Sequence, residues 1–171
     1  MGAHSRDEVE EAFRNYWRVG AVGEDWNAWA DLFTDDAVYT EHVLGHMRGS
    51  AEIKKWITSI MAAYPEIYTV YEWHAIDGDR VVVYMQNRRD SPDPNGPPID
   101  FPGVTLLEYA GDGKWRSEED FWAVPASQKA QAEYEKACAA HDPDHPKRMT
   151  RQNWPAEPAW ARGPARGPNA I

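Results

Sequence analysis

Glu41 is the residue whose surroundings most clearly suggest chemistry. It lies in the segment 37–43, where side chains alternate as they do along a β-strand, so that Tyr39, Glu41 and Val43 share one face. A carboxylate among apolar groups is desolvated, which favours its protonated form and suits it to proton transfer. We therefore expect Glu41 to act as a general acid or base if this face lines a cavity.

Several aromatic residues could complete such a site. The hydroxyl groups of Tyr16, Tyr39 and Tyr84 could donate hydrogen bonds to a substrate oxygen that gains negative charge. The alternative for each tyrosine is aromatic packing, with its hydroxyl bonded to a neighbour. Trp73 and Trp122 are expected to be hydrophobic walls, which would suit a flat, apolar ligand.

The elements that must position these residues follow from periodicity and turn signals. Apolar residues at helical spacing predict helices, and alternation bounded by glycine and aspartate predicts strands. We expect helices at 5–19, around 26–33, at 50–63 and at 127–140, and strands at 37–43, 68–76, 80–89, 104–109 and 114–124. Pairing across the Gly78-Asp79 turn predicts that Trp73, Tyr84 and Gln86 face the pocket, with His74 on the opposite face.

Composition excludes several classes of function. A formal net charge of −10 opposes binding to phosphate backbones, so nucleic acid is not expected as a partner. The single cysteine, Cys138, excludes an internal disulfide and a multi-thiolate zinc site, and no histidine or carboxylate spacing suggests another metal. No glycine-rich phosphate loop is present. The chain shows no signal peptide or bilayer-spanning run, so a cytoplasmic protein without membrane association is expected.

The chain is expected to form one domain, residues 1–141, followed by a proline-rich tail, residues 142–171. Six of the thirteen prolines lie in this tail. Trp154 and Trp160 could anchor it along the domain or along a partner subunit, and the alternative is a flexible extension.

The order of elements, with the sequence LFTDDAVY followed by a glycine and a helix ending near Trp56, resembles the nuclear transport factor two-like superfamily. This superfamily includes ketosteroid isomerases, SnoaL-like polyketide cyclases and limonene epoxide hydrolase. The resemblance covers roughly residues 8–125. It implies an α+β cone in which a curved, mostly antiparallel sheet wraps around three N-terminal helices, with a C-terminal helix and the tail added. Such domains commonly pair through the outer face of the sheet, so a homodimer is expected.

Similarity to ketosteroid isomerase implies roles for particular residues. The oxyanion tyrosine of that enzyme falls on Tyr16, and its general base falls on Glu41. Its second oxyanion donor falls near Thr105, a departure, because a hydroxyl is a weaker acid than a neutral carboxylic acid. A pocket tryptophan falls on Trp122, which by alternation turns Glu118 and Asp120 inward as well.

Similarity to limonene epoxide hydrolase implies a different arrangement. Asp120 falls on a catalytic aspartate, while Tyr39 and Glu41 fall on the water-positioning residues. The other members of that enzyme's Arg-Asp-Asp triad fall on Tyr84 and Gln86 when the Asp77-Gly78 turn is used as the anchor. A register slipped by several residues would instead use Arg88 and Asp90. The turn is the better anchor, so epoxide opening is disfavoured.

Glu41 and Asp120 are thus the main catalytic candidates, helped by Tyr16 and Tyr39. The predicted substrate-binding residues are Trp73, Tyr84, Gln86, Trp122, Glu118 and Thr105. The leading hypothesis is a cofactor-independent isomerase, dehydratase or cyclase acting on a hydrophobic small molecule. One alternative is hydrolysis with Asp120 activating water, and another is a non-catalytic ligand-binding or assembly module. The carboxylates could also face outward or pair with Arg88 or Arg116.

Overall fold

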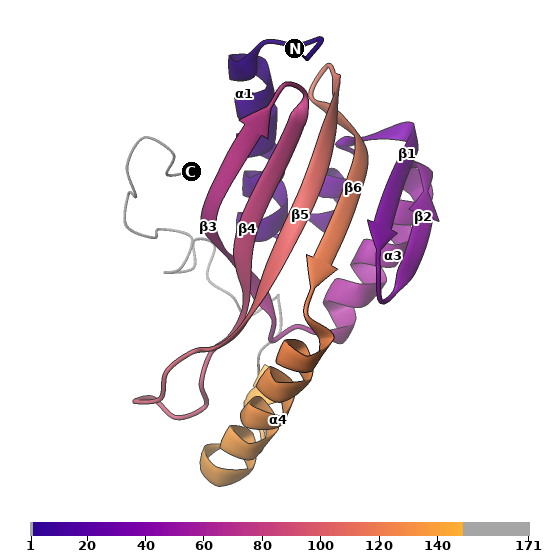
Figure 1. The fold of residues 1–171 in the computed structure, drawn as a ribbon. Helices are drawn as coiled ribbons and strands as arrows, with labels where there is room; N and C mark the ends of the chain where they lie inside the picture. The colour runs from indigo at the N-terminus through magenta and orange to yellow at the C-terminus, as the bar shows by residue number, and fades with distance from the viewer. Residues whose placement is uncertain (1, 149–171) are drawn as a thin grey trace.

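A computed structural model describes residues 2–148, and in it helices pack on one face of a single curved sheet (Figure 1). The sheet has six strands in the order β2-β1-β6-β5-β4-β3. They are β1 (Phe33–Glu41), β2 (Gly45–Arg48), β3 (Tyr68–Asp77), β4 (Arg80–Arg89), β5 (Ile99–Gly111) and β6 (Lys114–Trp122). All neighbours are antiparallel except β1 and β6, which run parallel. The expected α+β cone is confirmed.

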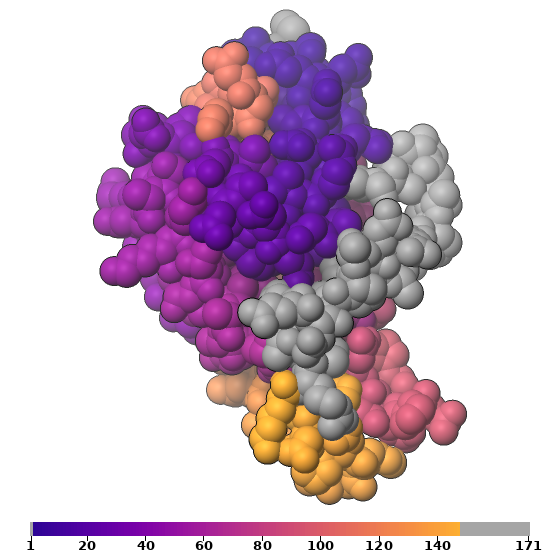
Figure 2. Space-filling view, turned by 180° about the vertical axis from the view of Figure 1, so that it is seen from behind, coloured from indigo at the N-terminus to yellow at the C-terminus, as the bar shows by residue number. Residues whose placement is uncertain are grey.

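Three N-terminal helices cover the sheet, and further helices follow it. They are α1 (Arg6–Trp17), α2 (Trp26–Ala30), α3 (Gly49–Ala63), α4 (Val124–His141) and the short α5 (His145–Arg148). The predicted cap of α1 is present, since the Ser5 hydroxyl accepts a hydrogen bond from the Glu8 backbone N–H at 3.2 Å. Asp25 caps α2 in the same way. Figure 2 shows this helical side, with the N-terminal helices in indigo beside α3 in purple.

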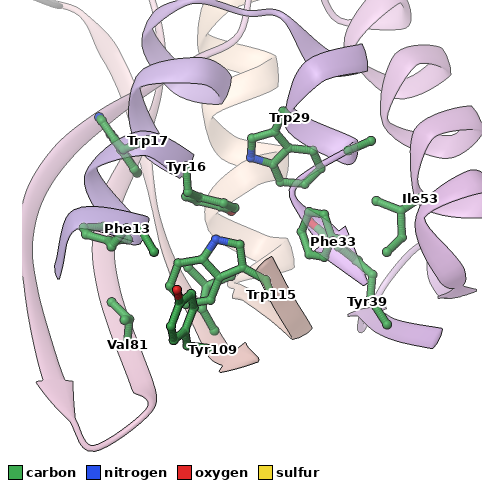
Figure 3. Packing of buried hydrophobic residues seen from close by; sticks show 14 of the residues in the cluster. Phe13, Tyr16, Trp17, Trp29, Phe33, Tyr39, Ile53, Val81, Tyr109 and Trp115 are labelled. Carbon is green, nitrogen blue, oxygen red and sulfur yellow. The ribbon is translucent and has the colours of Figure 1, made fainter. Parts of the chain in front are cut away.

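Aromatic side chains from the helices and the sheet make up much of the core (Figure 3). Tyr16 of α1 packs edge-on against Trp115 of β6, and Trp29 of α2 packs edge-on against Phe33 of β1. Trp115 is fully buried. Burying such large rings is a major source of stability, so the helices are held firmly over the sheet.

A π-helical turn, η1 (Arg18–Val22), joins α1 to the loop before α2. It brings Gly20 against the indole of Trp29, and a Cβ atom at position 20 would lie 2.4 Å from Trp29 Cδ1. Any side chain here would displace the indole, so glycine is required by close approach. The sequence indicated only that the glycines end the first helix.

The structure corrects several strand boundaries. β1 begins at Phe33, inside the expected helix, and ends at Glu41, so Val43 lies in a turn and is 48% exposed. β2 was not expected, because it is only four residues long, contains no β-branched or aromatic residue except His46, begins at Gly45 and is followed by Gly49. β5 begins at Ile99, several residues before the expected start. Its first residues pair with the end of β4, as far as Arg89.

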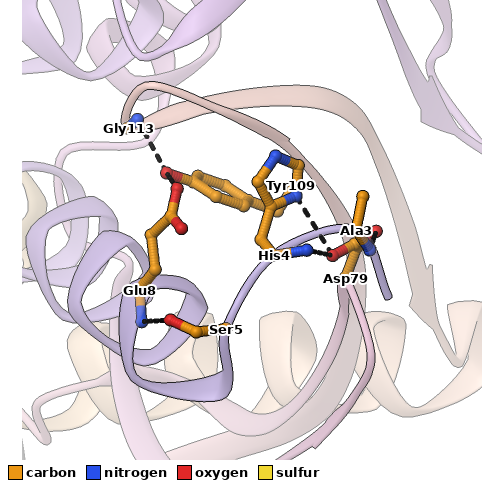
Figure 4. Close-up of polar contacts among 7 residues, drawn as sticks. All are labelled: Ala3, His4, Ser5, Glu8, Asp79, Tyr109 and Gly113. Atoms are coloured by element: carbon orange, nitrogen blue, oxygen red, sulfur yellow. Dashed lines mark hydrogen bonds and ion pairs between the residues drawn. The ribbon is translucent and has the colours of Figure 1, made fainter. Parts of the chain in front are cut away.

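The N-terminus is tied to the tips of both hairpins (Figure 4). The Asp79 carboxylate accepts hydrogen bonds from the backbone N–H groups of Ala3, at 2.7 Å, and His4, at 3.0 Å. These bonds hold the pKa of Asp79 below its ordinary value. At the other hairpin, the Tyr109 hydroxyl bridges Glu8 and the Gly113 backbone. This end of the cone is therefore closed.

Within residues 2–148, no helix combines the length and the apolar character needed to cross a bilayer. Trp154 and Trp160, the expected anchors of the tail, lie outside the described residues.

Candidate active site

A cavity of about 670 Å³ lies between the helices and the inner face of the sheet. Its volume is in the range that holds a small organic ligand. Tryptophans provide much of its wall: Trp17, Trp26, Trp29, Trp56 and Trp122. The acidic groups on the wall are Glu41, Glu118, Asp120 and Glu135, whereas Arg89 is the one basic residue among the described lining.

Asp120 lies on the inner face of β6 and accepts two short hydrogen bonds. The Tyr39 hydroxyl donates to Oδ2, and the Thr105 hydroxyl donates to Oδ1. Burial raises the pKa of Asp120 from 3.8 to about 6, and the nearby Glu41 charge adds to this effect while the two hydrogen bonds oppose it. Asp120 is therefore suited to accept a proton near neutral pH.

Glu118 lies two residues before Asp120 on the same face of β6. Its Oε1 accepts a hydrogen bond from the Tyr16 hydroxyl at 2.8 Å, and its buried Oε2 has no partner among the described residues. Burial, followed by the charge of Asp120, raises the pKa of Glu118 well above its ordinary value. Burial and the nearby charge of Asp120 therefore both favour the protonated form of Glu118.

Tyr16 and Tyr39 keep their protons beside this pair. Burial raises the pKa of each phenol well above its ordinary value, and the two carboxyl groups raise it further. Each tyrosine therefore remains a hydrogen-bond donor across the physiological range. The sequence named both residues, and the structure brings both to the Glu118–Asp120 pair.

Glu41 also faces the cavity and lies beside Asp120, since the two residues pair across the parallel strands β1 and β6. Its oxygens, however, already accept three hydrogen bonds. Oε2 accepts from the backbone N–H groups of Val43 and Leu44, and Oε1 accepts from the indole N–H of Trp122. This geometry shapes the β1–β2 turn and orients Trp122, and it leaves Glu41 less free to transfer a proton than Asp120.

Three predicted pocket residues lie elsewhere. Trp73 is 51% exposed and stacks on Tyr84 at 5.8 Å, and Gln86 donates to the Tyr84 hydroxyl at 3.3 Å. None of the three lines the cavity. The predicted pairing of Trp73 with Tyr84 is right, but the face is reversed. Both faces of this hairpin carry aromatic and aliphatic residues, so alternation alone does not identify the inner one.

A bulge in β3 between Tyr71 and Trp73 accompanies this reversal. Beyond it, His74 points inward, where it is 8% exposed, contacts the ring of Phe13 and bonds to Glu10 and Tyr71. His74 was expected on the face opposite the pocket, and that expectation is wrong.

The remaining predictions can be placed as follows. Thr105 and Trp122 line the cavity as expected. Arg88, a possible partner for the carboxylates, pairs instead with Asp100 at 2.6 Å, and Asp90 accepts from Tyr68. Among the described residues, no cluster of histidine, cysteine or carboxylate side chains could hold a metal ion.

Sequence reasoning missed the contribution of the helices and of Arg89 to the cavity. Trp26, Trp29 and Trp56 lie on the apolar faces of their helices, and such faces predict core packing. The same apolar face can also line a pocket, so the sequence pattern does not distinguish the two. Nothing in the sequence around Arg89 indicated burial.

Comparison with known proteins agrees with this fold. The model of the SnoaL-like domain family matches residues 9–118. No functionally curated protein matches the chain. Among solved structures, a hypothetical protein with a ketosteroid isomerase-like fold from Catenulispora acidiphila, in complex with trimethylamine, is 20% identical with a TM-score of 0.58, covering 75% of this chain and 95% of that one.

Two further solved structures are similar. A putative SnoaL-like polyketide cyclase from Jannaschia is 23% identical with a TM-score of 0.56, and the alignment covers 76% of this chain and 96% of that one. An epoxide hydrolase of M. tuberculosis that resembles limonene epoxide hydrolase is 15% identical with a TM-score of 0.60, covering 78% and 96%. At these identities the likeness shows the fold alone. Because the family model matches most of the chain, this protein belongs to the SnoaL-like domain family.

Proposed function

We propose that this protein is a cofactor-independent enzyme that moves a proton on a hydrophobic small molecule, as isomerases, dehydratases and cyclases do. The observation that carries the proposal is the Glu118–Asp120 pair, two buried carboxyl groups with different hydrogen-bond partners in one aromatic cavity. Two titratable groups whose surroundings separate their pKa values are suited to act as acid and base in the same reaction.

In the proposed mechanism, Asp120 is the base. Ionised Asp120 removes a proton from the carbon beside a substrate carbonyl, and Tyr39 and Thr105 fix the orientation of its carboxylate. Protonated Glu118 donates a hydrogen bond from Oε2 to the carbonyl oxygen as negative charge develops there. Tyr16, which donates to Oε1, holds Glu118 in place. In isomerisation the proton on Asp120 then returns to another carbon of the substrate. In dehydration it passes to the β-hydroxyl group, which leaves as water while the carbon–carbon double bond forms.

A substrate panel in water enriched in oxygen-18 tests this proposal. The panel contains flat, apolar β,γ-unsaturated ketones for isomerisation, β-hydroxy ketones for dehydration and epoxides for hydrolysis. We expect conversion of a ketone class to the conjugated enone, followed by its ultraviolet absorbance, with no labelled hydroxyl group in the product. Labelled diol from the epoxides alone would contradict proton transfer and favour water activation by Asp120.

A second candidate is a binding protein for an organic ammonium ion. Among the described residues, neither Asp120 nor Glu118 forms an ion pair with a basic side chain, and the surrounding tryptophans and tyrosines could hold a cation against their ring faces. A similar fold binds trimethylamine in the Catenulispora acidiphila protein. Calorimetry in two buffers of different ionisation enthalpy would detect trimethylammonium binding with proton release from the pair, and tert-butanol serves as the neutral control.

We also propose that two copies pair through the outer face of the sheet. The support is the exposed stack of Trp73 on Tyr84, an apolar surface that a partner would cover. Sedimentation velocity of the wild type and of Trp73→Arg would check this, with a dimer expected for the first and a monomer for the second.

A further inference from the structure

Arg89 is a buried guanidinium whose hydrogen-bonding capacity is incompletely used. It is the last residue of β4, is 3% exposed and lines the cavity. Its Nε donates to Glu66 at 3.4 Å and its Nη2 donates to Gln131 of α4 at 2.6 Å. Its Nη1 is buried without a partner among the described residues. A buried donor without an acceptor is costly, so this end of the cavity is suited to a ligand atom that accepts a hydrogen bond.

Arg89 lies far from the carboxyl pair. Along β5, Ile99 pairs with Arg89 and Thr105 pairs with Asp120, so six residues separate the two levels. At a rise of about 3.4 Å per residue, the backbones lie about 20 Å apart along the strand. The cavity thus has a polar group near each end. Trp122 lies between these two levels, since it pairs with Gly103 of β5.

The charges around Arg89 indicate what kind of acceptor fits. Glu66 neutralises the guanidinium in an ion pair, and Glu135, which accepts from Gln131 at 2.7 Å, adds a second negative charge close by. A ligand carboxylate would meet both acidic groups. A neutral oxygen can take the free Nη1 donors without that repulsion.

We infer that Arg89 is a specificity-determining residue that donates a hydrogen bond to a neutral oxygen, such as a ketone or ester carbonyl, at the end of the ligand remote from Asp120. The inference rests on the proposed function only in placing the reacting atoms at Asp120. The proposed substrate is therefore an elongated apolar molecule with oxygen at both ends.

Equilibrium dialysis with three probes of matched shape tests this inference: 4-acetylbiphenyl, 4-ethylbiphenyl and biphenyl-4-carboxylate. We expect the wild type to bind the acetyl probe about tenfold more tightly than the ethyl probe, because only the acetyl oxygen can accept a hydrogen bond from the charged donor. The carboxylate should bind more weakly than the acetyl probe. Equal binding of the acetyl and ethyl probes, or tightest binding of the carboxylate, would overturn the inference.

A charge-balanced double variant, R89M/E66Q, removes the donor without leaving Glu66 unpaired. It should bind the acetyl and ethyl probes equally, with affinity for the ethyl probe within about threefold of wild type. If both affinities fall together, Arg89 only fixes α4 through Gln131, and if the acetyl preference survives, the donor lies elsewhere. Either result overturns the inference.

Two single variants complete the design. Glu66→Gln keeps Arg89 but removes its counter-charge, so affinity for biphenyl-4-carboxylate should rise about tenfold while the acetyl preference remains. Loss of that preference would count against the inference. Asp120→Asn should keep the acetyl preference whether or not the protein proves to be an enzyme. The two proposals can therefore fail separately.

Discussion

The two faces of β6 carry the same residue type in different surroundings. Glu118, Glu119 and Asp120 are consecutive, yet the first and third face the cavity while Glu119 faces outward. On the outer face, Glu119 pairs with His42 at 2.7 Å, and both side chains are more than two-fifths exposed. On the inner face, burial raises the pKa of Glu118 and of Asp120.

This difference shows that the chemistry of a carboxyl group is set by the side of the sheet on which it lies. Water screens the outer pair, so its interaction contributes little to stability. The inner pair has lost that solvent, and its partners are tyrosine and threonine hydroxyl groups in place of a cation. A strand with alternating environments can therefore hold two buried carboxyl groups and a surface ion pair within three residues.

Replacing the inner base gives the largest expected effect. Asp120→Asn should lower kcat by about 10³-fold, within the range of about 10²–10⁴ typical of general acid–base catalysis. Glu119→Gln, the matched change on the outer face, should leave kcat within about twofold of wild type. The measurement is turnover of whichever ketone class the substrate panel identifies. Equal losses in the two variants would remove the distinction between the faces.

The same comparison explains how far sequence reasoning reached. The alternation of 37–43 correctly placed Tyr39 and Glu41 on one face of a strand, and the structure shows that this face lines the cavity. It failed for the β3–β4 hairpin, where Trp73 and Tyr84 are as hydrophobic as the residues that face inward, so composition does not distinguish the faces.

Other features of the site depend on distances that no local pattern encodes. Glu118 was expected to bind substrate, but its surroundings depend on Tyr16, which donates a hydrogen bond to it from a position 102 residues away in the sequence. The three donors to Glu41 arise from a tight turn and from Trp122 on another strand. Long-range packing decides which of the carboxyl groups is free to react.

The tyrosines offer a second, smaller test of the two faces. Tyr16→Phe removes the hydrogen bond that holds Glu118, so kcat should fall by about tenfold to a hundredfold, with KM changing less. Tyr84→Phe removes a hydroxyl on the outer face and should have no measurable effect on turnover. Steady-state kinetics of both variants decide the matter. A loss in Tyr84→Phe that matches the loss in Tyr16→Phe would contradict the assignment of the inner face.

The smallest effect concerns stability and its pH dependence. Burial raises the pKa of Asp120 in the folded protein to about 6, whereas the ordinary value is 3.8. Between these two pH values the folded protein binds the proton on Asp120 more tightly than the unfolded chain does. The stabilising contribution of the protonated group is therefore complete below about pH 4 and is lost as the pH rises through 6.

Asp120→Asn removes this titration. Relative to the wild type, the free energy of unfolding of the variant should rise between pH 4 and pH 7 by about 2 kcal/mol, since each unit of pKa shift is worth about 1.4 kcal/mol and residual hydration reduces the total. Glu119→Gln should follow the wild type throughout. Urea unfolding at several pH values in this range measures the difference. If the Asp120→Asn and wild-type curves run parallel, Asp120 has kept its water and the inner face offers no more than the outer one.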